Sequence, residues 1–362
     1  MMPRWVLALA PLLMILGLVA PIAGNGWMAA QLPFALAVIA VLGAGLSIFR
    51  PKIGEHILGL TVLGCGAASL LLMLATMAAP GLNAPGIWIF LAGLMLFLWC
   101  RLVALARLNA GGIAMLIAPG LFGVALLYLW QVFVVGFGVP QILLPAPSQV
   151  GQVLGLRIEV LWPDFLQTAQ AVVAGFVAGC AWGFFVAVVA DRVPFLKRGL
   201  LPLAGLISAV PIVGIAPIMV MWFGFDWQSK AAVVVVVTFF PMLVNTLAGL
   251  AAADAMQRDL MHSYGASYFQ TLAKLRLPTA LPFIFNALKI NSTLALIAAI
   301  VAEFFGSPIL GLGFRISAEV ARLNVDVVWA AIAIAALAGS LFYGAIAVAE
   351  RVFTFWHPSY RR

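Results

Sequence analysis

Long apolar runs alternate with short polar segments along almost the whole chain. About ten runs are each near the ~20 residues that an α-helix needs to cross ~30 Å of hydrocarbon. The runs cover approximately residues 5–20, 33–49, 57–77, 87–105, 113–135, 168–190, 200–222, 230–252, 283–305 and 327–348. This pattern predicts an all-α polytopic membrane protein with about ten transmembrane helices.

The positions of Lys and Arg predict an orientation for these spans. If the ten runs all cross the membrane, 14 of the 19 basic residues lie on one side, four lie on the other, and Lys289 lies within a span. Cytoplasmic loops are rich in Lys and Arg, so both termini are expected in the cytoplasm. The first run could also be a signal peptide, but we interpret it as a retained span because the topology is consistent only if it stays.

Composition supports the membrane assignment. The 362 residues are 65% hydrophobic and 8% charged, and their mean hydropathy is +1.17. Soluble domains are about half apolar and a quarter charged. The net charge of +8 is spread over the ends of apolar runs, which does not favour nucleic-acid binding. The three cysteines and three histidines are scattered and form no metal, disulfide or catalytic pattern, so we expect no catalytic residue, metal or cofactor in this chain.

The longest polar interruption in the second half of the chain lies at residues 254–281. Apolar residues recur there at the three- and four-residue steps of one helix face. They are Leu260, Met261, Tyr264, Tyr268, Leu272 and Leu275. Gly265 allows a turn, and Pro278 and Pro282 are expected to stop or restart a helix. The pattern predicts two short amphipathic helices joined by a bend; the alternative is a helix lying on the bilayer surface.

The spacing within this stretch resembles the EAA loop of ABC importer permeases. An acidic residue, Asp259, is followed by five residues, Gly265, nine residues, an apolar residue, one residue and Leu-Pro. Leu260 and Met261 replace the two alanines of the family pattern. The resemblance implies that the loop docks on an ATP-hydrolysing subunit. The expected coupling residues are Asp259, Leu260, Met261, Tyr264, Gly265, Ala266, Leu272, Leu277 and Pro278.

Other segments resemble one subgroup of these permeases, which imports taurine, alkanesulfonates, nitrate, or pyrimidine and thiamine precursors. They are Leu144–Ser148, Pro211–Pro217, Trp222–Gly224, Ala302-Glu303 and Gly311–Gly313. The resemblance implies a type I permease core at residues 111–362. Residues 1–110 would then form four extra helices. They are either an accessory bundle facing lipid or a region that stabilises the subunit pair or docks an auxiliary protein.

The resemblance also implies an assembly in the bacterial inner membrane. Two ATPase subunits would bind ATP and Mg, because the chain lacks a GxxxxGK[ST] phosphate loop. A second permease subunit, expected to be an identical copy, and an extracytoplasmic substrate-binding protein would complete the importer. This chain would transmit force by alternating access and would not itself be an enzyme.

Prolines and polar residues within the spans suggest a transport pathway. Pro211 and Pro217 predict either a simple kink or a break that lines the path. The candidate pathway residues are Pro211, Pro217, Trp222, Asn245, Asn291 and Glu303. For Glu303 an interfacial or helix-capping role is an equal alternative. Lys289 is expected to extend its amine to the cytoplasmic interface, with a role in substrate binding as the alternative.

Three other classes of function are possible for such a chain. A secondary transporter or channel without an ATPase is the main alternative, but it gives no reason for the EAA-like spacing. An intramembrane enzyme would need a catalytic constellation, and a structural scaffold would not need broken helices. The substrate is left open among sulfonates, nitrate and pyrimidine or vitamin precursors, with the last favoured.

Overall fold

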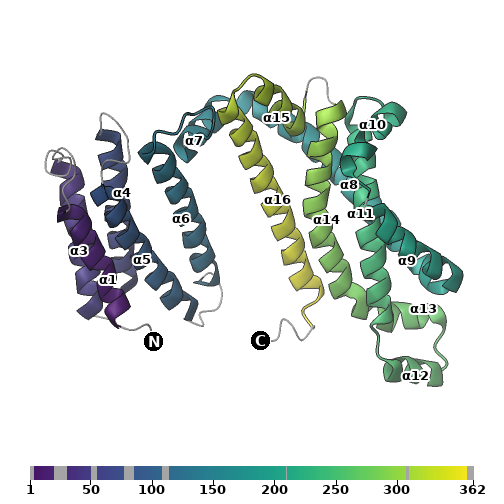
Figure 1. Cartoon of the computed structure of the whole chain (residues 1–362). Helices are drawn as coiled ribbons and strands as arrows, with labels where there is room; N and C mark the ends of the chain where they lie inside the picture. The colour runs from purple at the N-terminus through teal and green to yellow at the C-terminus, as the bar shows by residue number, and fades with distance from the viewer. Residues whose placement is uncertain are drawn as a thin grey trace. The chain divides into compact units, whose positions relative to one another are not determined.

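The computed structural model describes residues 4–19, 31–49, 55–76, 85–107, 114–208, 210–306 and 310–356. Every regular element in these residues is a helix (Figure 1), as the apolar runs predict. In this part of the chain six helices are long and apolar enough to cross a membrane, a bent pair can supply a seventh, and three apolar helices are shorter. Each of the predicted runs coincides with a helix or a helix pair, which confirms the all-α membrane fold.

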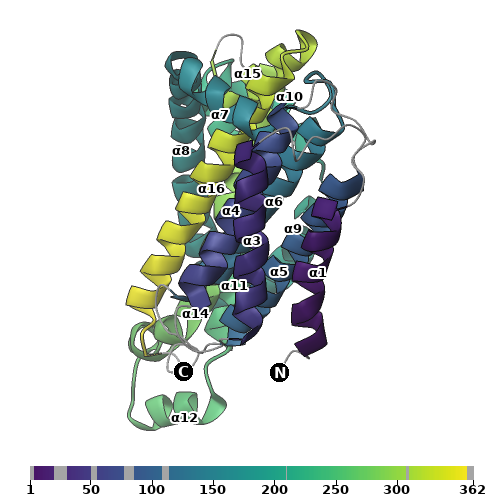
Figure 2. The same cartoon turned by 90° about the vertical axis from the view of Figure 1, so that its left-hand side faces the viewer.

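The chain divides by its internal contacts into two units, Met1–Gln149 and Val150–Arg362. Among the described residues of the first unit, five helices follow the first five apolar runs. They are α1 (Arg4–Val19), α3 (Gln31–Phe49), α4 (Glu55–Thr76), α5 (Pro85–Arg107) and α6 (Ala114–Gly136). In Figure 2 the helices α1, α3 and α4 run alongside one another. Met14 of α1 and Phe90 of α5 are fully buried in the hydrophobic core that these helices share with α3 and α4. A Cβ atom on Gly17 would lie 2.6 Å from the backbone nitrogen of Phe90, so α1 and α5 touch closely.

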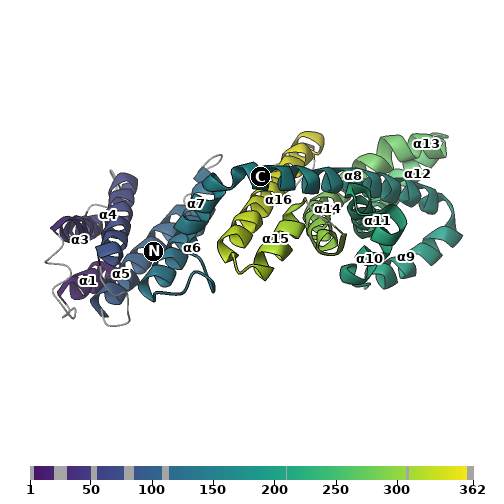
Figure 3. The same cartoon turned by 90° about the horizontal axis from the view of Figure 1, so that it is seen from above.

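Three long helices form the centre of the second unit: α8 (Ile158–Arg192), α11 (Trp227–Ala251) and α14 (Leu277–Gly306). They lie side by side with α11 in contact with both of the others (Figure 3). Gly175 and Gly183 of α8 face α11, and a Cβ atom on either would come within 2.5 Å of it. The small residues of this span therefore serve close helix packing.

The proline-rich run at residues 200–222 is a broken helix rather than a single kinked one. It consists of α9 (Pro194–Ser208) and α10 (Ile212–Phe223), which are bent by 103° relative to each other. Pro211 directly precedes α10 with a φ of −63°. Proline fixes φ near this value and lacks the N–H that would continue a helix across it, so the break follows from the sequence.

Several element boundaries differ from the sequence expectations. A shorter helix, α15 (Leu312–Ala321), lies between the last two apolar runs and precedes α16 (Val325–Phe353). Another short helix, α7 (Pro147–Leu156), precedes α8. The helix α8 begins ten residues before the predicted span at residue 168. Pro282 does not end a helix, since α14 begins at Leu277 and Pro282 lies inside it. Membrane-length apolar runs therefore located the helices but underestimated their polar extensions.

Candidate functional site

The polar stretch between α11 and α14 carries a short helix, α12 (Ala255–Ser263), none of whose residues is buried. Asp254 caps its start by accepting a hydrogen bond from the backbone N–H of Met256 at 3.3 Å. Met256, Leu260 and Tyr264 are 77%, 56% and 82% exposed, and their four-residue spacing places them on one face. An exposed apolar face on a short helix is typical of a surface that contacts another molecule.

A tight turn follows α12 and redirects the chain. Gly265 has a φ of +68°, a conformation that favours glycine. Ser267 then caps α13 (Tyr268–Thr271) in a reciprocal capping box with Gln270. The predicted pair of short helices with a bend at Gly265 is therefore confirmed, although α13 is only one turn long.

The apolar stripe predicted along this stretch is interrupted by the turn. Leu272 is 6% exposed and packs in the core of the chain itself, and Tyr268 is half-buried. Leu277 and Pro278, also predicted to contact a partner, begin α14 and are half-buried. Because Gly265 reverses the chain, the residues after it turn toward their own helices. The face open to a partner consists of Met256, Leu260 and Tyr264, with Asp259 and Phe269 also exposed and Met261 and Ala266 half-buried.

The inner side of this segment is held by an ion pair at the end of α8. Arg276 contacts Asp191 through two hydrogen bonds of 2.6 and 2.8 Å. Arg276 lies in a five-residue π-helix, η1 (Leu272–Arg276), between α13 and α14.

The candidate pathway residues occupy different environments. Pro211 and Pro217 are exposed on or beside α10, and Trp222 is 71% exposed at its end. Asn245 donates to the carbonyl of Pro241 in its own helix at 2.8 Å, which satisfies its amide locally. The positions on α10 therefore remain open to other molecules, while Asn245 is tied to its helix.

Asn291 is fully buried between helices. Its amide nitrogen donates to the carbonyl of Thr238 at 2.8 Å and contacts the sulfur of Cys180 at 3.2 Å. Its carbonyl oxygen has no hydrogen-bond partner among the described residues. These contacts join α14 to α11 and α8.

Glu303 belongs to a buried polar cluster that sequence analysis did not assemble. Its carboxylate accepts hydrogen bonds from Thr168 at 2.8 Å and from the backbone N–H of Gly313 at 2.7 Å. Asp164 accepts from the N–H of Gly311 at 3.0 Å and from Arg315 at 2.7 Å. We call these six residues the Glu303 cluster; it fixes the start of α15 onto α8 and α14. In the sequence, only the Gly311–Gly313 motif that follows Glu303 pointed toward this cluster.

Lys289 is held by a partner on another helix. Its amine forms a 2.8 Å ion pair with Glu350 of α16. Glu350 is itself buried within this long helix, so the amine of Lys289 is paired with a buried acid, and its extension to the membrane interface stays a prediction.

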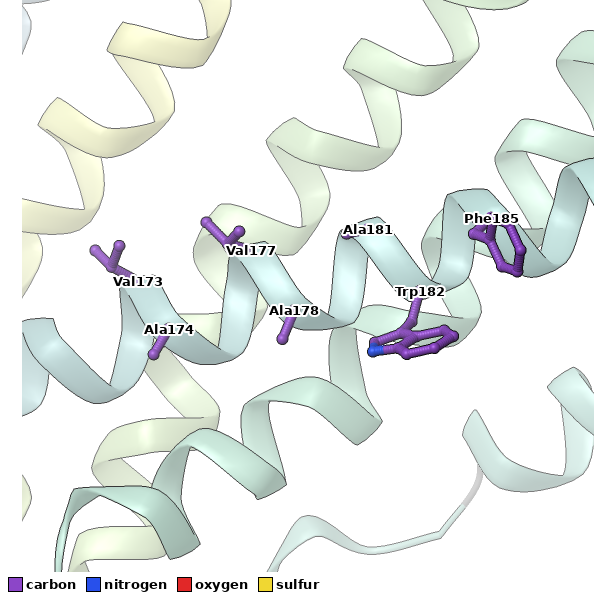
Figure 4. Close-up of a pocket in the computed structure, with 7 residues that line it drawn as sticks. All are labelled: Val173, Ala174, Val177, Ala178, Ala181, Trp182 and Phe185. Carbon is purple, nitrogen blue, oxygen red and sulfur yellow. The ribbon is translucent and has the colours of Figure 1, made fainter.

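One broad hollow lies against α8 and is lined by that helix alone (Figure 4). Its volume is about 650 Å³ and it is almost entirely apolar. The lining residues are Val173, Ala174, Val177, Ala178, Ala181, Trp182 and Phe185. Without a charged group it offers nothing to orient a polar solute, and its chemistry suits lipid chains or another helix. Within the described residues, no three His, Cys, Asp or Glu side chains are grouped to hold a metal ion.

Comparison with known proteins gives one consistent result. Residues 179–353 match the family described as "Binding-protein-dependent transport system inner membrane component". The chain is 32% identical over 219 residues to a probable ABC transporter permease protein of Haemophilus influenzae, covering 60% of this chain and 89% of the relative.

Two other relatives have names that include a solute. The formylaminopyrimidine transport permease protein ThiX of Halalkalibacterium halodurans is 30% identical over 239 residues, which are 66% of this chain and 95% of the relative. The taurine transport system permease protein TauC of Escherichia coli is 29% identical over 221 residues, 59% of this chain and 80% of the relative.

Proposed function

Because the chain belongs to the family of binding-protein-dependent inner-membrane ABC transporter permeases, we propose that residues 254–281 couple it to an ATPase subunit. The observation that carries this proposal is the exposed apolar face of Met256, Leu260 and Tyr264 on α12. Protein interfaces combine a buried apolar centre with a polar rim. Exposed Asp259 beside this face supplies part of such a rim.

The assembly that follows contains more than this chain. Two ATPase subunits bind ATP and Mg, a second copy of the permease completes the membrane part, and an extracytoplasmic binding protein delivers the solute. ATP-driven closure of the ATPase pair moves the coupling segments, and the membrane helices alternate between inward and outward access. The distribution of Lys and Arg supports cytoplasmic termini and a cytoplasmic coupling segment.

The core of the importer is proposed to span residues 111–362, preceded by an accessory region at 1–110. The family match at 179–353 lies within the proposed core. The division by contacts falls elsewhere, at residues 149 and 150, because α6 packs with the preceding helices. An importer core that starts at α6 would therefore share this helix with the accessory region.

The solute is proposed to be small and polar, with a pyrimidine or vitamin precursor as the first candidate and a sulfonate such as taurine as the second. The names of two relatives support these classes. The exposed rings of Trp222 and Phe223 on α10 suit a planar solute that stacks on aromatic surfaces. Binding of both candidates to the partner binding protein, measured by calorimetry, separates them.

The coupling proposal is tested by purifying the chain together with its ATPase from membranes. Leu260→Asp places a charge on the apolar face of α12 and is expected to abolish retention of the ATPase. His262→Asp places the same charge on the opposite face of the helix and is expected to leave retention unchanged. Equal retention in both variants would refute docking through this face. Solute uptake that continues without any ATPase would favour the secondary-transporter alternative.

A further inference from the structure

A buried carboxylate lies at the end of α8 where a helix disfavours negative charge. Asp191 is the second-last residue of this helix, and its side chain is 4% exposed. The C-terminus of a helix carries partial negative charge, so an acid there is unfavourable unless other groups stabilise it. Burial raises this cost further. The position therefore calls for a strong and specific partner.

Arg276 supplies that partner and joins three helices through one guanidinium group. Two of its nitrogens bind both carboxylate oxygens of Asp191, a bidentate geometry that fixes direction as well as distance. Its third nitrogen donates to the carbonyl of Leu250 at 3.0 Å. Leu250 lies in the last turn of α11, where backbone carbonyls lack helical partners. Arg276 thus ties the ends of α8 and α11 to the segment that leads into α14.

Tyr268 makes a second connection to the same carboxylate. Its hydroxyl donates to Asp191 at 3.2 Å, and the guanidinium of Arg192 lies 4.3 Å from the centre of its ring. Tyr268 is the first residue of α13, only three residues after the Gly265 turn. Both ends of the segment that follows α12 are therefore held at the end of α8.

The π-helix η1 aligns these two contacts. Tyr268 and Arg276 are eight residues apart, which on a regular α-helix would separate their directions by about 80°. The wider turn of Leu272–Arg276 rotates the chain less per residue and brings Arg276 toward the side of Tyr268. Irregular turns of this kind are frequent at functional sites.

We infer that Asp191, Arg276 and Tyr268 are positioning residues that transmit movement of the coupling segment to α8 and to the broken helix α9–α10. We call these three residues the Asp191 clasp. The broken helix begins at Pro194, three residues after Asp191, so a displacement of the clasp is delivered directly to its start. Without the clasp, a push on α12 and α13 would still reach α11 and α14 through the backbone and through the packing of Leu272, but it would lose its hydrogen-bonded connection to the end of α8. The inference rests on the proposed docking of α12 to an ATPase.

The test uses the complete importer in proteoliposomes and needs no identified solute. In a background in which the three native cysteines are replaced by alanine, Met221→Cys places a reporter on α10, where the native residue is 83% exposed. The rate of its alkylation is measured with and without ATP plus vanadate. Retention of the ATPase is measured in the same preparations.

Asp191→Asn and Arg276→Gln are expected to retain the ATPase but to lose the ATP-dependent change in alkylation rate. A wild-type change on the order of tenfold, the usual scale of coupling between sites, would fall to less than about twofold. Arg276→Lys keeps the positive charge but lacks the planar guanidinium that binds both carboxylate oxygens. It should recover part of the ATP-dependent change in alkylation rate. Tyr268→Phe removes only the hydrogen bond of the hydroxyl to Asp191 and should lose a smaller part of the ATP-dependent change in alkylation rate. Arg198→Gln, an exposed arginine on α9, is the matched control and should behave as wild type.

Each result decides the inference. A wild-type change in Asp191→Asn and Arg276→Gln would overturn it, because movement would then reach α10 without the clasp. Loss of ATPase retention in these variants would also overturn it, since the clasp would only shape the docking face. Failure of the unmodified chain to retain any ATPase would instead refute the proposed function.

Discussion

Gly311 offers a sharp test of how the Glu303 cluster is built. Its φ of +129° and ψ of 147° lie in a region that is essentially restricted to glycine. A Cβ atom there would lie 2.6 Å from the carboxylate carbon of Glu303 and 2.7 and 2.8 Å from its oxygens. Gly311→Ala therefore imposes two separate costs, one on the backbone and one on the buried carboxylate.

The size of both costs follows from these contacts. The backbone strain is worth roughly 1–3 kcal/mol. Displacing Glu303 breaks its bonds to Thr168 and to the N–H of Gly313, and a buried polar group left without a partner costs about 1–3 kcal/mol. We expect Gly311→Ala to lower the free energy of unfolding by roughly 2–6 kcal/mol in total.

A double-mutant cycle in mixed micelles separates the backbone strain from the cost of displacing Glu303. Unfolding is followed by tryptophan fluorescence for Gly311→Ala, Glu303→Ala and the double variant. In the Glu303→Ala background the clash is absent, so Gly311→Ala should cost only the backbone strain. Gly205→Ala is the control, since nothing lies within 4 Å of a Cβ atom at that helical position. If Gly311→Ala is no more destabilising than Gly205→Ala, the argument from φ and contact is refuted.

Three further predictions concern packing, charge and coupling. Gly179→Val should destabilise the α8–α11 contact by about 1–3 kcal/mol, seen as an earlier unfolding midpoint, because a Cβ atom there already meets the α11 backbone. Lys289→Met should lower the free energy of unfolding by roughly 1–3 kcal/mol in the same assay, because it leaves Glu350 buried without this ion pair. This is less than the loss of about 3–5 kcal/mol expected for a fully buried pair, since the Lys289 side chain is 20% exposed. Lys289→Met combined with Glu350→Leu should recover that loss. Gly265→Val should disrupt the turn after α12 and reduce solute uptake per ATP hydrolysed in proteoliposomes without preventing membrane insertion.

The sequence was most informative where one physical rule dominates. Apolar length predicted each long helix, since a bilayer requires about 20 apolar residues in a row. Pro211 and Gly265 marked a break and a turn, because their backbone preferences act locally. Gly175 and Gly183 indicated close packing because only small side chains permit it.

The residues that sequence analysis missed depend on contacts between distant segments. Asp191 and Arg276 are 85 positions apart, and no periodicity connects them. Lys289 and Glu350 are 61 positions apart on two different helices. Tyr268 fitted the apolar stripe by spacing, but its hydroxyl made it a partner for Asp191. A regular helical count across this stretch also could not anticipate the π-helix that brings Arg276 into place.

The buried acids Asp164 and Asp191 lie near opposite ends of α8. At 1.5 Å per residue they are about 40 Å apart, more than the ~30 Å of a hydrocarbon core. Charges within a membrane interior are costly and rare, so the ends of a spanning helix are where strong ion pairs can form at lower cost. Each acid binds an arginine from another helix, Arg315 on α15 and Arg276 on η1. Between them, Gly175 and Gly183 pack α8 tightly against α11. A helix that is fixed at both ends and closely packed along its middle resists bending, and resistance to bending is the property that a force-transmitting element of an importer requires.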